Sequence, residues 1–155
     1  MTGHQAAAPP STRETRSRPA ALRQANLAIV IVLIIQFALG ISVNLYVTLP
    51  GAGHPGHASW FGNGALLALH VALGMFLVLA AVFVLVRAII ARNRALIATS
   101  AAGFVAIGAA FSFGSEFTDK LTNGYSLGMA IAFAVALACY VIGLYAASAR
   151  RGEPS

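Results

Sequence analysis

The stretch LAIVIVLIIQFALGISVNLYVTL, residues 27–49, decides the fold class of this chain because it contains no charged side chain. An α-helix rises about 1.5 Å per residue, so about 20 apolar residues cross the hydrocarbon core of a bilayer. Lipid offers no partner to free backbone groups, and a membrane span of this length must therefore be helical. The stretch is too long for a cleaved signal peptide and no A-x-A-like site follows it, so we expect a retained transmembrane helix.

Three further apolar spans follow, at residues 65–90, 95–113 and 125–149. A segment rich in Gly and Pro, residues 49–64, and the short turn ARNR, residues 91–94, interrupt the helical pattern. We predict an all-α fold, a four-transmembrane-helix bundle with up-down-up-down topology over residues 25–149. Residues 1–24 are predicted to be a disordered basic cytoplasmic tail, and residues 150–155 a cytoplasmic C-terminal tail.

The composition agrees with a membrane protein. Hydrophobic residues make up 59% of the chain, charged residues only 9%, and the mean hydropathy is +0.81, whereas about a quarter of a soluble domain is charged. The net charge of +6 comes from arginines beside apolar spans, not from a basic patch interleaved with aromatic residues. We therefore expect the lipid bilayer as the main partner and no nucleic acid. The single cysteine, Cys139, cannot form an intrachain disulfide.

The arginines predict the orientation of the bundle. All of them lie before the first span, around the turn between the second and third spans, or after the fourth. These residues are Arg13, Arg16, Arg18, Arg23, Arg87, Arg92, Arg94, Arg150 and Arg151. By the positive-inside rule this side is cytoplasmic. We thus expect a multi-pass protein of a bacterial plasma membrane with both termini in the cytoplasm.

Polar residues recur at four-residue spacing and so share a helix face. The first span carries Gln36, Gly40, Asn44 and Thr48 in this register. Intramembrane polar side chains usually face the bundle interior. Because neighbouring helices run in opposite directions, several of these side chains should meet at one depth in a small polar cavity. The predicted lining of this cavity is Gln36, Asn44, His70, Ser112, Glu116 and Met129.

His70 is the one histidine inside an apolar span, and two interpretations of it stay open. In the first, His70 is structural and hydrogen-bonds to Asn44 or Ser112. In the second, His70 and Gly74 form an H-x-x-x-G half-site similar to that of small four-helix b-type cytochromes, with imidazole as an axial ligand of haem b. The second axial ligand would then be Met129, a histidine of the outer loop or His70 of a second chain. We expect no cofactor and keep haem b as the alternative.

A second histidine pattern lies in the outer loop. His54 and His57, in the sequence HPGH, could bind zinc or copper together with Glu116 or Asp119. The alternative is an ordinary solvated loop.

The fourth span carries a ridge of small residues, Gly124, Gly128, Ala132 and Ala136. Such ridges allow helices to approach closely. The ridge either packs within the bundle or forms a homodimer or membrane-complex interface. In addition, NGALLALHVALG (residues 63–74) and NGYSLGMAIAFA (residues 123–134) align, which indicates either two duplicated helical hairpins or a chance similarity of apolar sequences.

The chain lacks the sequence patterns of an enzyme. It contains no nucleophile elbow, no H-E-x-x-H and no phosphate-binding loop. Transport usually needs a charged residue at mid-membrane, and only the neutral Gln36 lies that deep. The leading hypothesis is a plasma-membrane protein without catalytic activity, a scaffold or a small subunit of a membrane complex. The alternative is a haem-binding or electron-transfer protein that uses His70.

Three segments carry a resemblance to a known group of proteins. They are NLYVTLPG (residues 44–51), LHVALGMFLVLA (residues 69–80) and TNGYSLGMAIAF (residues 122–133). With the Ala- and Arg-rich composition, they resemble small four-helix integral membrane proteins of high-GC bacteria, which are grouped as families of unknown function. The resemblance implies an integral plasma-membrane protein and no particular activity.

Overall fold

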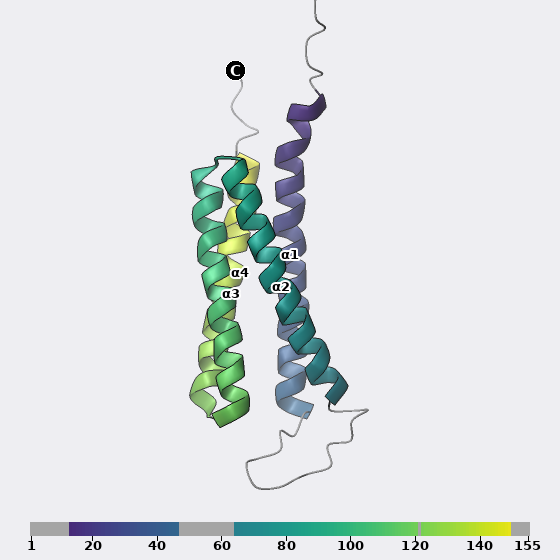
Figure 1. Ribbon diagram of the computed structural model, residues 1–155, viewed down its shortest axis with the longest axis vertical. Helices are drawn as coiled ribbons and strands as arrows, with labels where there is room; N and C mark the ends of the chain where they lie inside the picture. The colour runs from purple at the N-terminus through teal and green to yellow at the C-terminus, as the bar shows by residue number, and fades with distance from the viewer. Residues whose placement is uncertain (1–12, 47–63, 121, 150–155) are drawn as a thin grey trace, which may run out of the picture.

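The structure is a computed structural model that describes residues 13–46, 64–120 and 122–149, and these residues form four α-helices (Figure 1). The helices are α1 (Arg13–Tyr46), α2 (Ala65–Ile90), α3 (Arg94–Lys120) and α4 (Asn123–Ala149). Each is long and apolar enough to cross a membrane, and the described ranges contain no β-strand. The predicted all-α four-helix fold is therefore confirmed. The length and apolar composition of the four helices are those of an integral membrane protein.

Successive helices run in opposite directions (Figure 1). The start of α1, the turn between α2 and α3, and the end of α4 lie at one end of the molecule, which we call the arginine end after Arg23, Arg87, Arg92 and Arg94. The opposite end, where α3 finishes at Lys120, is the lysine end. The up-down-up-down order predicted from the four spans is thus the observed one.

The helix boundaries differ from the predicted spans mainly at α1. This helix begins at Arg13, and only its part from Ala20 onward is apolar enough to span a membrane. Residues 13–24, predicted as part of a disordered tail, are therefore helical. Residues 1–12 and 150–155, the rest of the predicted tails, lie outside the described residues.

The turn between α2 and α3 reverses the chain in three residues. Arg92 has a φ of 51°, a left-handed conformation, and its N–H donates to the carbonyl of Ile89 at 2.9 Å. Left-handed residues commonly close a helix C-terminus in this way. The Asn93 side-chain oxygen then accepts a hydrogen bond from the N–H of Leu96 at 3.4 Å, as an N-cap does.

Apolar residues from all four helices form the core. The main cluster consists of Ile29, Leu33, Leu77, Ala81, Val84, Ala106, Ile107, Ala136 and Tyr140. A smaller cluster at the arginine end consists of Leu22, Ala88, Leu96 and Ala147. The most extensive contact is between α3 and α4, which lie side by side, while α2 passes from α3 at the arginine end to α1 at the lysine end (Figure 1). Buried residues of α2 begin only at Leu77, so its first three turns contribute none to the core.

The small-residue ridge of α4 packs mostly within the chain. A Cβ on Gly128 would lie 3.2 Å from the ring of Phe113 on α3, and Ala132 and Ala136 are buried. Only Gly124 has open space around it. Gly128 and Ala136 thus pack within the chain, while Ala132 also lines an open groove described below. A homodimer or membrane-complex interface through this ridge stays a prediction.

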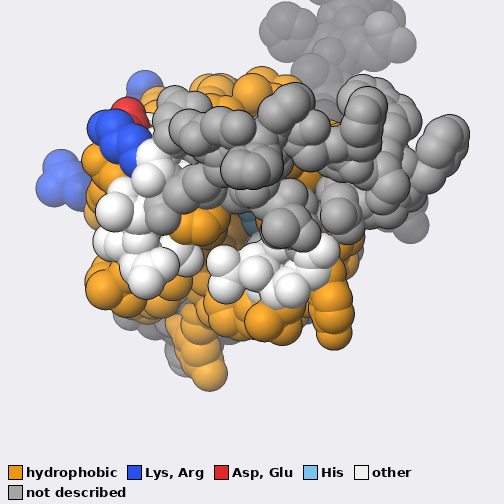
Figure 2. All heavy atoms as spheres, turned by 90° about the horizontal axis from the view of Figure 1, so that it is seen from below, with side chains coloured by type: hydrophobic (Ala, Val, Ile, Leu, Met, Phe, Trp, Pro, Cys, Tyr) orange, Lys and Arg blue, Asp and Glu red, His pale blue; other side chains and the backbone are white. Residues whose placement is uncertain are grey.

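Large apolar side chains cover the outside of the bundle, among them Leu79, Val105 and Ile142, each more than half exposed. Figure 2 views the molecule from the lysine end and shows hydrophobic side chains around its perimeter, with the charged ones gathered on one side. A surface of this kind is suited to lipid, in which exposed apolar side chains cost nothing.

Candidate functional site

The polar contact inside the membrane span joins α1 to α2. The Gln36 side-chain amide Nε2 donates a hydrogen bond to the backbone carbonyl of His70 at 3.0 Å. The same Nε2 lies 3.4 Å from His70 Nε2, a longer and weaker contact. A hydrogen bond at this contact requires the neutral imidazole tautomer that carries its proton on Nδ1. His70 is thus bound to the neighbouring helix through both its backbone and its ring.

Two glycines make room for this pair in a reciprocal way. A Cβ on Gly40 of α1 would lie 3.2 Å from Cε1 of the His70 ring, and a Cβ on Gly74 of α2 would lie 3.2 Å from Gln36 Nε2. In each helix the glycine follows the polar residue by four positions, so the two share a face. Since the helices are antiparallel, each polar side chain rests on the glycine of the other helix.

The hydrogen-bonding capacity of the pair is only partly used. Gln36 Oε1 and His70 Nδ1 are both buried and have no hydrogen-bond partner among the described residues. One is an acceptor and the other, in the tautomer above, a donor. Neither atom is open to the surface.

The predicted hydrogen bond from His70 to Asn44 or Ser112 is wrong. Asn44 is exposed, and the hydroxyl of Ser112 donates to the Gly108 carbonyl of its own helix at 3.0 Å. The partner of His70 is Gln36, two turns deeper than Asn44 on the same face of α1. The prediction failed because the depth of each side chain was assigned by counting residues from the helix ends. Gln36 and Asn44 share one face of α1, so the four-residue spacing alone allows either of them to meet His70.

The other predicted lining residues lie on the α3–α4 side. The sulfur of Met129 would be 3.3 Å from a Cβ on Gly114 of α3. Glu116 forms an ion pair with Lys120 one turn away, at the lysine end. The structure thus brings Gln36 and His70 together but gives Met129 and Glu116 other neighbours. A common cavity lined by all six residues stays a prediction.

Lys120 is the centre of a small polar group at the end of α3. Its ammonium donates to the Glu116 carboxylate and, at 3.2 Å, to the hydroxyl of Tyr125 in the first turn of α4. The hydrogen bond to Glu116 has the larger effect and the bond to Tyr125 the smaller one, and both raise the pKa of Lys120. The group is exposed, and exposed ion pairs contribute little to stability. It links α3 to α4 but offers no enclosed site.

The metal prediction concerns residues that the structure does not describe. His54 and His57 lie outside the described ranges. Within those ranges there is no group of three or more His, Cys, Asp or Glu side chains that could hold a metal ion. The predicted zinc or copper site therefore stays a prediction.

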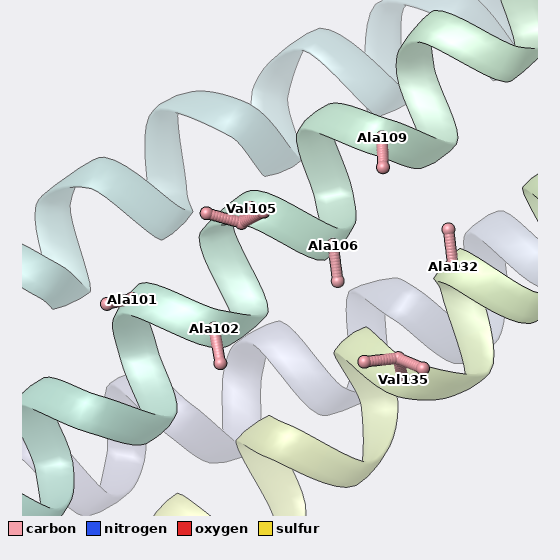
Figure 3. A pocket seen from close by; sticks show the side chains of 7 residues that line it. All are labelled: Ala101, Ala102, Val105, Ala106, Ala109, Ala132 and Val135. Atoms are coloured by element: carbon pink, nitrogen blue, oxygen red, sulfur yellow. The ribbon is translucent and has the colours of Figure 1, made fainter.

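A groove between α3 and α4 is a feature that the sequence analysis missed. It is apolar, open to the outside and about 500 Å³ in volume. Figure 3 shows small side chains of both helices facing the space between them. The lining is Ala101, Ala102, Val105, Ala106 and Ala109 of α3 with Ala132 and Val135 of α4. The signal in the sequence was the run of small residues in the third span, which by itself does not distinguish a groove from an internal contact.

Comparison of the chain with protein-family models, with curated proteins and with solved structures gives no match.

Proposed function

We propose that this chain is a non-catalytic component of a bacterial plasma membrane, a scaffold or small subunit that receives a helix of a partner membrane protein in the α3–α4 groove. The observation that carries the proposal is the groove lining, five alanines and two valines. In lipid, helices associate where small residues let their backbones approach closely. Bulky residues such as Phe83 and Ile142, which cover other parts of the exposed surface, keep a neighbouring backbone farther away.

The proposed orientation places the arginine end in the cytoplasm. Arg23, Arg87, Arg92 and Arg94 are all exposed and lie near the ends of the apolar spans on that side. Positively charged residues close to span ends are retained on the cytoplasmic side. An even number of spans then puts both termini in the cytoplasm.

The haem alternative has less support from the contacts of His70. The space beside Gly40 holds the His70 ring, and the space beside Gly74 holds the Gln36 amide. A macrocycle that approached either glycine would have to displace these side chains. Met129, the suggested second ligand inside the membrane, contacts Gly114 on α3, away from the α1–α2 contact. These contacts favour a structural role for His70.

Site-specific photocrosslinking in native membranes tests the partner helix. A photoreactive residue is placed at Ala102 or Val105, which are exposed in the groove, and as a control at Leu79 or Val82 on the exposed face of α2. We expect a discrete crosslinked protein species from the groove positions and only lipid adducts from the α2 positions.

A filled groove provides the matched test. Ala102→Phe should abolish the crosslinked species obtained from Val105, whereas Ala98→Phe, on the exposed surface of α3 outside the groove lining, should leave it intact. Lipid adducts alone at Val105, or equal protein crosslinking from α2, would contradict the proposal.

A further inference from the structure

Two arginines of the arginine end lie inside the apolar spans rather than beyond them. The apolar part of α1 begins at Ala20 and that of α2 ends at Ile90. Arg23 and Arg87 each lie three residues inside these limits, which is about 4.5 Å at the rise of an α-helix. Both side chains are exposed, so their charges face the surroundings of the bundle and not its core.

Packing of the bundle brings the two arginines to one level. Leu22 of α1 and Ala88 of α2 belong to the same buried cluster at the arginine end. Leu22 is adjacent in sequence to Arg23, and Ala88 is adjacent to Arg87. Two different helices therefore present a cation at the same depth, close to the boundary between the apolar spans and the polar surroundings.

The side chain of Arg87 is directed toward the membrane interior. Its guanidinium carbon lies 5.7 Å from the centre of the Phe83 ring. Because α2 runs toward the arginine end (Figure 1), Phe83 is one helical turn farther from that end than Arg87. The Phe83 side chain is 57% exposed, so the pair lies on the outer surface of the helix. The ring attracts the positive charge, but it supplies no carboxylate or phosphate oxygen to the N–H donors of the guanidinium.

Negative charge is absent from a long part of the sequence around these arginines, because no Asp or Glu occurs between residues 15 and 115. The exposed arginines that the structure describes at this end all fall in that range, and they are Arg23, Arg87, Arg92 and Arg94. Clustered arginines at a membrane surface attract anionic lipids. Charge complementarity therefore favours a lipid with a net negative headgroup over a zwitterionic lipid, whose own cation already balances its phosphate.

We propose that the arginine end binds the phosphate of an anionic phospholipid, with Arg87 as the deepest contact and Arg23 as a second contact at the same level. A guanidinium matches phosphate oxygens through paired N–H bonds. The lipid phosphate lies at the outer limit of the acyl chains, near the depth at which Arg87 contacts Phe83, and the acyl chains cover the apolar surface around the pair. The proposal depends neither on the α3–α4 groove nor on the side of the membrane that the arginine end faces.

Lipid titration of the purified protein tests the proposal. Native mass spectrometry in mild detergent measures the binding of phosphatidylglycerol and of phosphatidylcholine with the same acyl chains. We expect phosphatidylglycerol to bind more tightly. Arg87→Gln and Arg23→Gln should each weaken its binding about fivefold, the usual effect of one arginine at an anionic surface. Arg87→Lys should weaken it less, because the charge remains and only the paired N–H geometry is lost.

A charge at the other end of the bundle provides the matched control. Lys120→Gln also removes one positive charge, from an exposed side chain paired with Glu116 at the lysine end. It should leave phosphatidylglycerol binding unchanged, and phosphatidylcholine binding should be the same in all variants. Glycerol phosphate, which carries a phosphate but no acyl chain, should not displace the lipid at equal concentration.

Three results would overturn the proposal. They are equal affinity for the two lipids, an equal loss of phosphatidylglycerol binding in Lys120→Gln and Arg87→Gln, and unchanged binding in both Arg87→Gln and Arg23→Gln. Displacement of the lipid by an equal concentration of glycerol phosphate would assign the arginines to a free phosphate instead.

Discussion

At the scale of single residues, the contact between Gln36 and His70 is the clearest polar feature of the membrane-spanning part. Each side chain rests on a glycine of the opposite helix, and in both cases a Cβ added to that glycine would lie 3.2 Å away. The pair therefore combines a hydrogen bond with close helix packing, the two interactions that hold helices together in lipid. Asn44, two turns away on the same face of α1, has neither.

This contact predicts a measurable loss of stability. Gln36→Leu should lower the free energy of unfolding in detergent by about 1 kcal/mol, the usual size of an interhelical hydrogen bond in a membrane protein. Asn44→Leu is the matched control, because Asn44 is exposed, and it should have almost no effect. In a His70→Leu background, Gln36 loses its contact with the imidazole ring but keeps its hydrogen bond to the backbone carbonyl of residue 70. The effect of Gln36→Leu should therefore be smaller there, but not zero.

The same purified protein allows the haem alternative to be checked by its absorption spectrum. We expect no Soret band from the wild-type protein. A Soret band that is lost in His70→Ala would overturn the structural interpretation of His70 given above.

At the scale of helices, Gly103 lets α3 pack directly against the Tyr140 ring of α4. A Cβ there would lie 2.7 Å from Cε2 of Tyr140, closer than real contacts permit, and Tyr140 is fully buried and cannot move aside. We expect Gly103→Ala to destabilise the protein by about 1–3 kcal/mol, the usual cost of overpacking. Gly108→Ala on the same helix is the control, since nothing lies within 4 Å of its Cβ position.

Both variants are compared by their free energy of unfolding in detergent. An equal loss of stability in the two variants would contradict the prediction that the Tyr140 ring leaves no room for a Cβ at position 103. A loss in Gly103→Ala alone would confirm it.

The helices themselves could be predicted from the sequence, but their contacts could not. Length and hydropathy alone determine which segments can cross a bilayer, and α2 was expected and observed at residues 65–90. The start of α1 at Arg13 was missed because the segment before the span is polar. Helical spacing gives the face of Gln36 and Asn44 but not which of them meets His70. That choice depends on the path of α2 across the bundle, which no local pattern encodes.

At the scale of the whole molecule, the proposed orientation can be tested with single cysteines in a Cys139→Ala background. Ala91 lies in the turn at the arginine end, Thr122 lies between α3 and α4 at the lysine end, and both are exposed. On intact cells, a membrane-impermeant maleimide should label Thr122→Cys. It should label Ala91→Cys only after the membrane is permeabilised. The reverse pattern would place the arginine end outside, against the positive-inside rule.

The strong pairing of α3 with α4 has a consequence for the synthesis of this protein. Of the four spans, α3 has the lowest mean hydropathy. Transfer of α3 by itself from the translocon into lipid is therefore the least favourable of the four in free energy. Helix α3 also makes its most extensive contact with α4, the span that emerges after it. We expect α3 to wait at the translocon until α4 arrives, and the two to enter the bilayer as a helical hairpin. Ribosome stalling between these two helices would then leave α3 incompletely inserted, whereas α1 and α2 would already be in the membrane.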